Sequence, residues 1–390
     1  MPHWGVIRAR GADAAQFIHG QLSQDFVLLG PDQARLAAFC NAKGRMQASF
    51  IGIKPDAQTI LLVCERSLLA QTLKRLRMFV LRAQCQLDDA SEAFALWGLV
   101  GASVPAPCAS AWQVHSDGTA HTIGLPPGAD HARALWLAPA DTAPPPVPQL
   151  PTATWQWLEV MSAVPLVSAA VYEQFVPQML NYESVGGVNF KKGCYPGQEV
   201  VARSQFRGTL KRRAYLAQAA GALAPGDEVF AINNADEPAG LVVISAPNPG
   251  NNGQWSAVIA IQTKAAAQAL QANGVALALL PLMPGFGWII RYLALWPMCT
   301  LIFVPSAIGG AIMGLGGARR FLLGCLLPPL FVTAGVLGLD SGYAANLMAS
   351  APLWGTALSA LIIAGTGAPR DMAQSGAAER GRRKGSKKGG

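Results

Sequence analysis

The residues best suited to do chemistry lie together in one short segment, Lys191-Lys192-Gly193-Cys194-Tyr195-Pro196-Gly197-Gln198-Glu199. The ammonium groups of Lys192 and Lys191, two and three residues before Cys194, would favour the thiolate form of an accessible cysteine. The glycines of the segment allow backbone conformations and close approaches that other residues do not. On the residues alone, two interpretations stand: a reactive thiol at Cys194, or a glycine-rich connector in which the cysteine is buried.

The other residues that could serve catalysis or metal binding are scattered. The seven cysteines form no Cys-x-x-Cys pair, and the five histidines lack the spacing of metal ligands. There is neither a Walker loop nor a dinucleotide-binding glycine motif. We interpret the histidines, at positions 3, 19, 115, 121 and 131, as structural or surface residues. Unpaired cysteines suit a reducing compartment and no signal peptide is apparent, so we expect residues 1–284 in the cytoplasm.

The elements that must position the segment begin with an α+β region over residues 1–138. We expect strands at residues 4–9, 34–39, 46–53 and 60–64, and a helix that Asp13 caps. The clearest helix covers residues 68–83, where leucines recur at helical spacing. Six prolines within residues 139–151 then predict a linker or loop, because such a run fits neither a helix nor a central strand.

Residues 152–212 carry the segment around Cys194 and are expected to complete the region begun by residues 1–138. They are expected to be helical from Trp155 to about Val164 and loop-rich from there to Arg207. Beyond them, short alternating runs separated by turn residues predict a small β-barrel over residues 213–284. The expected strands of this barrel are residues 213–217, 228–232, 240–244 and 256–261.

The charge content of the chain changes after residue 284. Residues 1–284 contain 20 basic and 19 acidic side chains, whereas residues 285–369 contain three arginines and one aspartate. Three apolar stretches in the latter region each reach the roughly 20 residues that cross a bilayer. The sequence thus predicts two or three transmembrane helices, an inner-membrane anchor, and a basic disordered tail at residues 370–390. Three buried helices of a soluble core are the alternative.

Several blocks, in order along the chain, resemble the YgfZ proteins. This family is related to the glycine-cleavage aminomethyltransferase and to mitochondrial iron–sulfur assembly factors. The central blocks are Phe175-Val176-Pro177-Gln178, Asn181-Tyr182-Glu183 and the segment from Lys191 to Arg203. Nearer the N-terminus, Gln21-Leu22-Ser23-Gln24-Asp25 and Cys40-Asn41-Ala42-Lys43-Gly44-Arg45 are also similar. The resemblance spans about residues 4–284, and we interpret the apolar region as a fusion to an unrelated segment.

The resemblance implies a three-lobed aminomethyltransferase-like fold that binds tetrahydrofolate or a derivative at its centre. It also implies a role in the assembly or repair of iron–sulfur enzymes, including those that modify tRNA. Carried over by position, it implies a functional thiol at Cys194 and contacts to the folate from Trp4, Trp155, Lys192, Gly193, Tyr195, Gly197, Gln198, Glu199 and Arg203. For both tryptophans, packing in the core is the alternative interpretation.

A local excess of positive charge lies in and after the segment from Lys191 to Glu199, which is called the motif below. Residues 191–213 hold seven basic side chains and a single acid, Glu199. Such a cluster fits a solvated loop, the glutamate tail of a folate, or the phosphates of RNA. Because aromatic residues do not alternate with the cations in an RNA-binding pattern, we favour the folate. Direct binding of tRNA has no separate support in the sequence.

Two departures from the family pattern bear on the reaction. Ser162-Ala163-Val164-Pro165 lacks a glycine, and Gln47-Ala48-Ser49 stands where aminomethyltransferases carry acidic residues. A carboxylate there would be the expected proton carrier in aminomethyl transfer. We therefore expect a folate-binding accessory protein. The alternatives are a folate-dependent aminomethyl or methyl transferase, and a membrane protein whose main function lies in residues 285–369.

Overall fold

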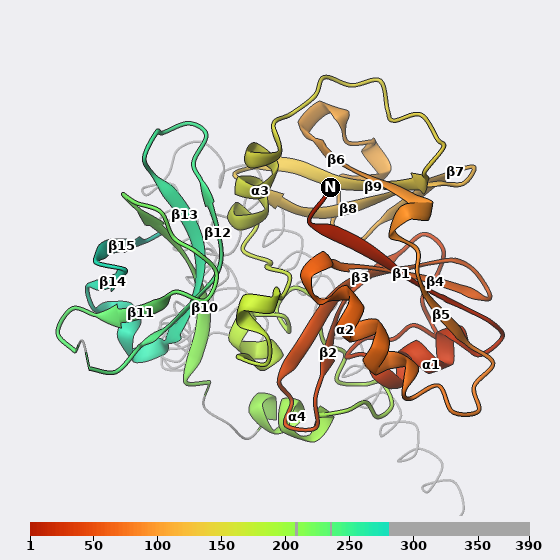
Figure 1. The fold of residues 1–390 in the computed structure, drawn as a ribbon, viewed down its shortest axis with the longest axis horizontal. Coiled ribbons are helices and arrows are strands. Elements are labelled where there is room, and N and C mark those ends of the chain that lie inside the picture. The colour runs from red at the N-terminus through yellow and green to blue at the C-terminus, as the bar shows by residue number, and fades with distance from the viewer. Residues whose placement is uncertain (207–209, 235, 281–390) are drawn as a thin grey trace, which may run out of the picture. The chain divides into compact units, whose positions relative to one another are not determined.

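The computed structural model describes residues 1–206, 210–234 and 236–280. They belong to one compact unit, Met1–Leu282, in which the described residues form two open antiparallel sheets, a closed barrel and four α-helices (Figure 1). The expected transmembrane helices at residues 285–369 and the basic tail lie outside the described residues. None of the helices in the described part is both long and apolar enough to cross a membrane.

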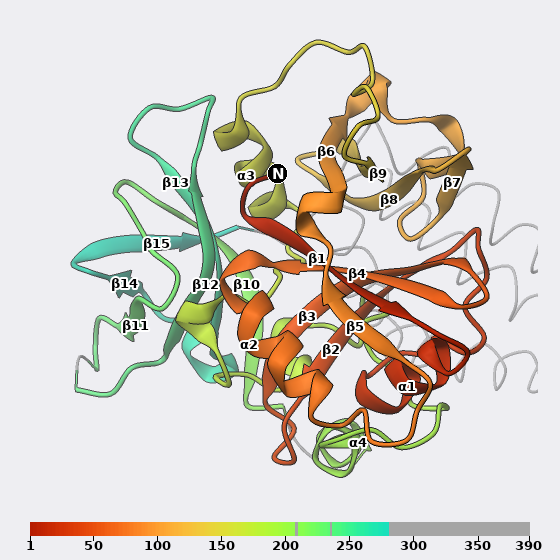
Figure 2. The ribbon, with the colours of Figure 1, turned by 45° about the vertical axis from the view of Figure 1, so that its right-hand side comes forward.

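The first sheet has the strand order β2-β3-β4-β1-β5. Its strands are β1 (Trp4–Arg10), β2 (Ala34–Cys40), β3 (Met46–Asp56), β4 (Thr59–Glu65) and β5 (Gln86–Asp89). Two helices, α1 (Ala14–Gln21) and α2 (Arg66–Arg77), pack beside these strands (Figure 2). Ile18 and Leu73 from the helices meet Phe39 and Phe50 from the sheet in one buried core. The four expected strands and both expected helices are therefore present, but the Asp13 side chain does not cap α1, because its Oδ2 accepts a hydrogen bond from the N–H of Gln84 instead.

Helix α2 is shorter than the sequence predicts, because it ends at Arg77 rather than at residue 83. Its last turn carries Lys74, Arg75 and Arg77, which interact favourably with the negative end of the helix dipole. Arg77 Nη2 also donates a 2.7 Å hydrogen bond to the carbonyl oxygen of Leu87, which ties the helix end to β5. Val80 still packs against the core, so the apolar pattern continues past the point where the helix stops.

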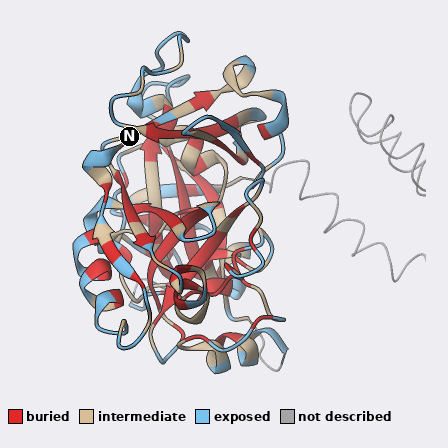
Figure 3. Ribbon diagram, turned by 90° about the vertical axis from the view of Figure 1, so that its right-hand side faces the viewer, coloured by how far each residue is buried: buried red, intermediate tan, exposed pale blue. Residues whose placement is uncertain are grey.

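The second sheet has the order β6-β9-β8-β7. Its strands are β6 (Phe94–Val100), β7 (Val114–Asp117), β8 (Ala120–Gly128) and β9 (His131–Pro139). Val6 and Ile51 of the first sheet share a buried core with Ile123 and Leu135 of the second. Figure 3 shows that buried residues follow the strands, whereas the connecting loops are mostly exposed.

The barrel forms in the predicted place. It closes in the order β10-β13-β12-β11-β14-β15, with β10 (Arg212–Ala219), β11 (Glu228–Ala231), β12 (Gly240–Pro247), β13 (Trp255–Gln262), β14 (Leu270–Ala272) and β15 (Val275–Leu279). The sequence predicts only the first four of these strands. Helix α3 (Thr152–Met161) follows the proline-rich loop and contacts β8 on one side and β12 and β13 on the other.

The expectation of loops through Arg207 is wrong for residues Gln198–Phe206, which form helix α4. Two β-branched residues, Val200 and Val201, lower the helix propensity of this stretch. Packing outweighs that preference, because Val201 is fully buried in the core that also holds Phe175. An i,i+4 ion pair on the outer face, described below, supports the same helix.

Candidate functional site

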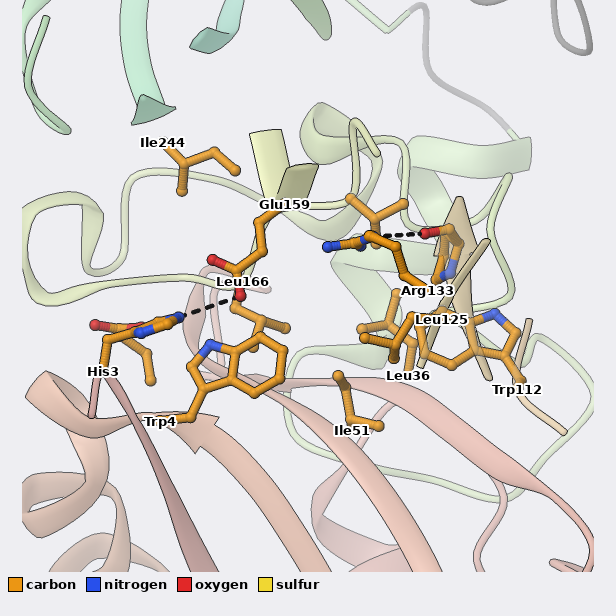
Figure 4. Close-up of a pocket in the computed structure, with 13 residues that line it drawn as sticks. His3, Trp4, Leu36, Ile51, Trp112, Leu125, Arg133, Glu159, Leu166 and Ile244 are labelled. Carbon is orange, nitrogen blue, oxygen red and sulfur yellow. Dashed lines mark hydrogen bonds and ion pairs between the residues drawn. The ribbon is translucent and has the colours of Figure 1, made fainter. Parts of the chain in front are cut away.

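A pocket lies where the two open sheets, α3 and the barrel meet (Figure 4). Its empty volume, including the part open to solvent, is about 510 Å³. Ile51 from the first sheet, Leu125 from the second and Ile244 from the barrel form apolar parts of its wall. The titratable residues that line it are His3, Glu65, Arg133 and Glu159.

Of the two tryptophans singled out in the sequence, Trp4 lines this pocket, whereas Trp155 contacts Trp4 without lining the pocket, so its contact with a ligand stays a prediction. The two rings meet edge to face with centroids 6.3 Å apart. Both side chains are also buried in the core between the sheets, so packing and ligand contact are compatible roles for Trp4. Trp112 adds a second aromatic wall that the sequence analysis does not single out.

Glu159 is held in place by two donors. It lies one helical turn after Trp155 on α3, and this spacing puts both side chains on one face of the helix. Its Oε1 accepts a 2.6 Å hydrogen bond from Trp155 Nε1 and lies 3.1 Å from His3 Nε2. The expectation that His3 is a structural or surface residue is therefore incomplete, because its ring lines the pocket and orients a carboxylate there.

Glu65 ends β4 at the pocket wall. Burial raises the pKa of its carboxyl group to about 7, an effect that His3 opposes and the neighbouring Glu159 carboxylate reinforces. A carboxyl group with such a pKa exists in both protonation states near neutral pH. Glu65 can therefore donate a hydrogen bond to a ligand in the pocket when protonated, or accept one from it when ionised.

Arg133 is the most deeply buried cation of the pocket, with 4% of its surface exposed. Its Nε donates a 3.1 Å hydrogen bond to the carbonyl oxygen of Pro126, and its guanidinium carbon lies 5.1 Å from the ring centroid of Trp155. Burial lowers the pKa of Arg133 to about 10, against the opposing effect of Glu159, so the group stays charged at neutral pH. Its buried Nη1 has no hydrogen-bond partner among the described residues.

No residue of the segment from Lys191 to Glu199 lines this pocket. Instead, Lys192 Nζ donates to the backbone carbonyl oxygens of His19 and Leu22, at 2.7 Å from the latter. The same Nζ lies 4.8 Å from the ring centroid of the buried Tyr195. Burial lowers the pKa of Lys192 to about 8, although nearby acidic groups oppose the change. Lys192 thus attaches the motif to the end of α1, and the Tyr195 ring lies against the Lys192 ammonium group.

Gly197 attaches the motif to the tip of the β2–β3 hairpin. Its φ is +80°, and a Cβ atom at this position would lie 2.3 Å from the carbonyl oxygen of Asn41. Only glycine avoids both the strain and the collision. The hairpin tip is itself shaped by Asn41 Oδ1, which accepts hydrogen bonds from the N–H groups of Lys43 and Arg45. Close packing accounts for Gly197, so its contact with a ligand stays a prediction.

The remaining motif residues face outward or lie at the surface. Cys194 is exposed, whereas the other four cysteines of the described residues are buried, so the interpretation of Cys194 as a buried connector residue is wrong. Glu199 and Arg203 form a 2.6 Å ion pair on the solvent face of α4, and Gln198 begins that helix. Gly193 lies beside α1, where a Cβ atom would be 3.6 Å from His19 Nε2. The structure therefore places the pocket that Trp4 lines apart from residues 191–197, the loop that carries Cys194 and is called the cysteine loop below.

The positions where aminomethyltransferases carry acidic residues are buried in β3. Gln47 Nε2 donates to Tyr172 Oη at 2.8 Å and to Glu173 Oε1 at 2.6 Å. Ser49 Oγ accepts a 2.7 Å hydrogen bond from the N–H of Val167. Both side chains connect the first sheet to the segment that leads to the motif, which is a structural use of these positions.

Arg133 and Glu159 were not predicted as site residues, although a pattern in the sequence could have indicated each of them. Arg133 is the only Arg, Lys, Asp or Glu residue of β9, and an isolated cation in an apolar strand indicates a buried polar contact. Glu159 stands four residues after Trp155, the spacing that joins side chains on one helix face. Glu65 follows an apolar strand like many surface residues, and only the fold shows that this strand end faces a pocket.

Comparison with known proteins links the chain to one group. No protein-family model matches it. The tRNA-modifying protein YgfZ of Yersinia pseudotuberculosis is 28% identical over 230 residues, which cover 54% of this chain and 68% of that protein. The Escherichia coli tRNA-modifying protein YgfZ is 29% identical over 228 residues, covering 55% and 69%. The chain thus spans about two thirds of the length of these relatives.

A solved structure shows the same fold. Glycine cleavage system aminomethyltransferase T from Bartonella henselae superposes with a TM-score of 0.55 at 14% sequence identity, over 71% of this chain and 82% of that protein. The predicted aminomethyltransferase-like fold with a small β-barrel is therefore confirmed for the described part of the chain. At this level of identity the likeness concerns the fold alone.

Proposed function

We propose that this chain acts in tRNA modification as YgfZ proteins do, by binding a tetrahydrofolate-type ligand and supporting iron–sulfur enzymes. Similarity to the tRNA-modifying YgfZ proteins supports the role. The observation that carries the ligand is the pocket, whose aromatic and apolar walls surround an unpartnered guanidinium nitrogen. Flat apolar walls suit a pterin ring, and a buried donor suits an oxygen on that ring.

The residues present fit the pterin head group better than the glutamate tail. Trp4 and Trp112 offer aromatic surface, and Arg133 offers a fixed donor within the wall. The tail would extend from the pocket toward solvent. Contact between the glutamate tail and the Lys191–Glu199 motif is not part of the proposal, because no residue of that motif lines the pocket. The cysteine loop is instead proposed to serve a second step, contact with a client enzyme through the exposed Cys194.

A calorimetric titration of the full-length chain with tetrahydrofolate tests the proposed ligand. Wild type is expected to bind, and Ile244→Arg, which places a charge and added bulk at the pocket wall, is expected to abolish binding. Ile232→Arg is the matched control, because Ile232 is exposed and lies outside the pocket lining. Absence of heat with wild type, or unchanged binding by a folded Ile244→Arg, would contradict the proposal.

The cellular role has its own test. In a bacterium that lacks its YgfZ protein, the wild-type chain is expected to restore the thiolated nucleosides of total tRNA, measured by mass spectrometry. Ile244→Arg is expected to fail where Ile232→Arg succeeds. Restoration by both variants would separate the tRNA role from the pocket.

Folate-dependent group transfer remains the second candidate because of Glu65. A carboxyl group with a pKa of about 7 at the pocket wall has the acidity that proton transfer at neutral pH requires. Turnover of a methyl- or methylene-substituted tetrahydrofolate, followed chromatographically, would favour this candidate. Binding without turnover would favour the accessory role.

A further inference from the structure

The tip of the β2–β3 hairpin, helix α4 and the start of β10 lie side by side and carry basic residues. The hairpin tip is next to α4 (Figures 1 and 2), and a Cβ atom at Gly44 in this tip would be 3.1 Å from the Cβ atom of Val200. Gln178 connects α4 to β10, because its side chain donates a 2.7 Å hydrogen bond to the carbonyl oxygen of Val201 and its own carbonyl oxygen accepts one of 3.0 Å from Arg213 Nη1. These elements therefore form one surface, called the α4 surface below.

The α4 surface carries cations without carboxylate partners. Five basic residues on it or directly beside it form no ion pair with any described residue: Lys43, Arg45, Lys191, Lys211 and Arg212. The acids Glu183 and Glu199 do not neutralise them, because they are already paired with Arg213 and Arg203. A group of cations of this kind favours a ligand with several negative charges.

Arg45 and Arg212 lie near each other although both are cationic. Burial and, to a smaller extent, the charge of Arg45 lower the pKa of Arg212. Arg45 is held in place by its Nη1, which donates a hydrogen bond to the carbonyl oxygen of Gln174. An anion between two guanidinium groups removes their repulsion and accepts hydrogen bonds from both, and phosphate oxygens suit such groups particularly well.

An exposed aromatic ring belongs to the same surface. Phe206, in the last turn of α4, has 71% of its surface exposed, and its ring meets that of Phe190 edge to face with centroids 5.5 Å apart. Arg203 stands three residues before Phe206, a spacing that puts both side chains on one side of the helix. Lys191 directly follows Phe190. An exposed ring that a neighbour supports and cations flank is the arrangement on which the bases of a single strand stack.

We propose that the α4 surface binds a single-stranded segment of RNA, with Arg45 and Arg212 on a backbone phosphate and a base stacked on Phe206. The choice of a tRNA as this RNA rests on the proposed function. A duplex fits less well, because its bases are stacked on one another and are not available to Phe206.

Two other anionic partners fit this surface less well than RNA. A membrane surface would require several exposed apolar side chains, whereas Phe206 is the one large apolar residue that the hairpin tip, α4 and β10 expose. The glutamate tail of a folate in the pocket is disfavoured because none of the five unpaired cations lines the pocket.

The salt dependence of tRNA binding to the full-length chain tests the phosphate contacts. Filter binding of an unmodified tRNA transcript between about 50 and 200 mM salt gives the slope of log K against log salt concentration. Arg45→Gln combined with Arg212→Gln is expected to reduce this slope by about 1.4, because each phosphate contact to a single strand contributes about 0.7. Lys54→Gln combined with Arg66→Gln removes the same charge from residues outside the α4 surface and is expected to leave the slope nearly unchanged.

Two replacements of Phe206 test the stacking. Phe206→Leu keeps an apolar side chain without an aromatic face and is expected to weaken tRNA binding about 5- to 100-fold. Phe206→Tyr keeps the ring and is expected to bind as wild type does. Because Phe206 is exposed, neither replacement disturbs the core. Equal affinities for the two variants would overturn the stacking.

The thiol of Cys194 is a reporter that requires no variant. It is exposed and stands three residues before Gly197, where a Cβ atom would lie 2.3 Å from the carbonyl oxygen of Asn41 in the hairpin tip. Bound tRNA is therefore expected to slow the alkylation of Cys194 by iodoacetamide, followed by mass spectrometry of the peptide that contains it. An RNA duplex at the same phosphate concentration is expected to protect it much less.

The outcomes separate the inference from the proposed function. Absence of tRNA binding, or tRNA binding with an unchanged salt slope in the double variant and unprotected Cys194, would overturn the inference. The proposed function would stand in both cases, because support of the modifying enzymes requires no direct contact with tRNA. Protection of Cys194 by phosphatidylglycerol vesicles but not by tRNA would overturn the inference in favour of a membrane surface. The proposed function fails separately, if the chain neither binds tetrahydrofolate nor restores the thiolated nucleosides.

Discussion

Replacing Glu65 by glutamine tests the effect of burial on a carboxyl group at the pocket wall. The folded-state pKa of Glu65 is raised from its ordinary value of 4.5 to about 7, chiefly by burial. A carboxyl group with a raised pKa contributes stability that is present below pH 4.5 and is lost as the pH rises through 7. The variant lacks the charge at every pH, so it does not lose this stability.

The magnitude follows from the two pKa values. A difference of one pH unit corresponds to about 1.4 kcal/mol, so the change from 4.5 to about 7 corresponds to about 3 kcal/mol. Because the pocket is partly open to solvent, screening reduces this figure to about 1.5 kcal/mol. The groups that face Glu65 are His3 and Glu159, with Arg133 on the same pocket; all three are retained in the variant.

Urea unfolding of the full-length chain at pH 5, 6, 7 and 8, followed by tryptophan fluorescence, measures the effect. Glu65→Gln is expected to be about 1.5 kcal/mol more stable than wild type at pH 8 and nearly equal to it at pH 5. Glu92→Gln, which removes an exposed carboxylate paired with Arg66, controls for the loss of one negative charge. Parallel pH profiles for wild type and Glu65→Gln would refute the reasoning.

Three further outcomes are expected. Gly197→Ala should lower the free energy of unfolding by more than about 2 kcal/mol, through backbone strain and collision with Asn41. Gly186→Ala, also at positive φ but with nothing within 4 Å of a Cβ atom, should lower it by about 1 kcal/mol. Equal urea midpoints for the two variants would contradict this expectation. Cys194→Ala should leave the melting temperature and tetrahydrofolate binding unchanged but abolish restoration of tRNA thiolation, and full restoration would show that the thiol is dispensable. The full-length chain should remain in the membrane pellet after a carbonate wash if residues 285–369 insert as their sequence predicts, and its release would contradict that prediction.

The strands of the first sheet could be predicted because their pattern is local. Residues 34–39 and 46–53 are apolar runs on either side of a turn that contains Asn41 and Gly44, and the structure forms β2 and β3 there. Helix α4 could not be found in this way, because its burial depends on Val201 meeting a core assembled from distant segments. The same reason explains β14 and β15, whose short sequences gain strand structure only by closing the barrel.

For the candidate site, too, one part could be predicted from the sequence and another could not. Motif resemblance led to Trp4 and Trp155, which the fold does bring together. It also grouped them with Lys192 and Gly197, which the fold places against α1 and the hairpin tip instead. Resemblance along a sequence shows that residues belong to one family pattern, but distance in space depends on the path of the chain between them.

The wide separation of the pocket residues in the sequence has a consequence for biosynthesis. His3 enters the growing chain first and Ile244 last. At typical elongation rates, on the order of 10–50 s pass between the two. During that time the apolar face of the first sheet that contributes Leu36 to the pocket lacks the barrel residues Val243 and Val258, which pack in the same core. The pocket can therefore be completed only after the chain has been synthesised beyond Ile244.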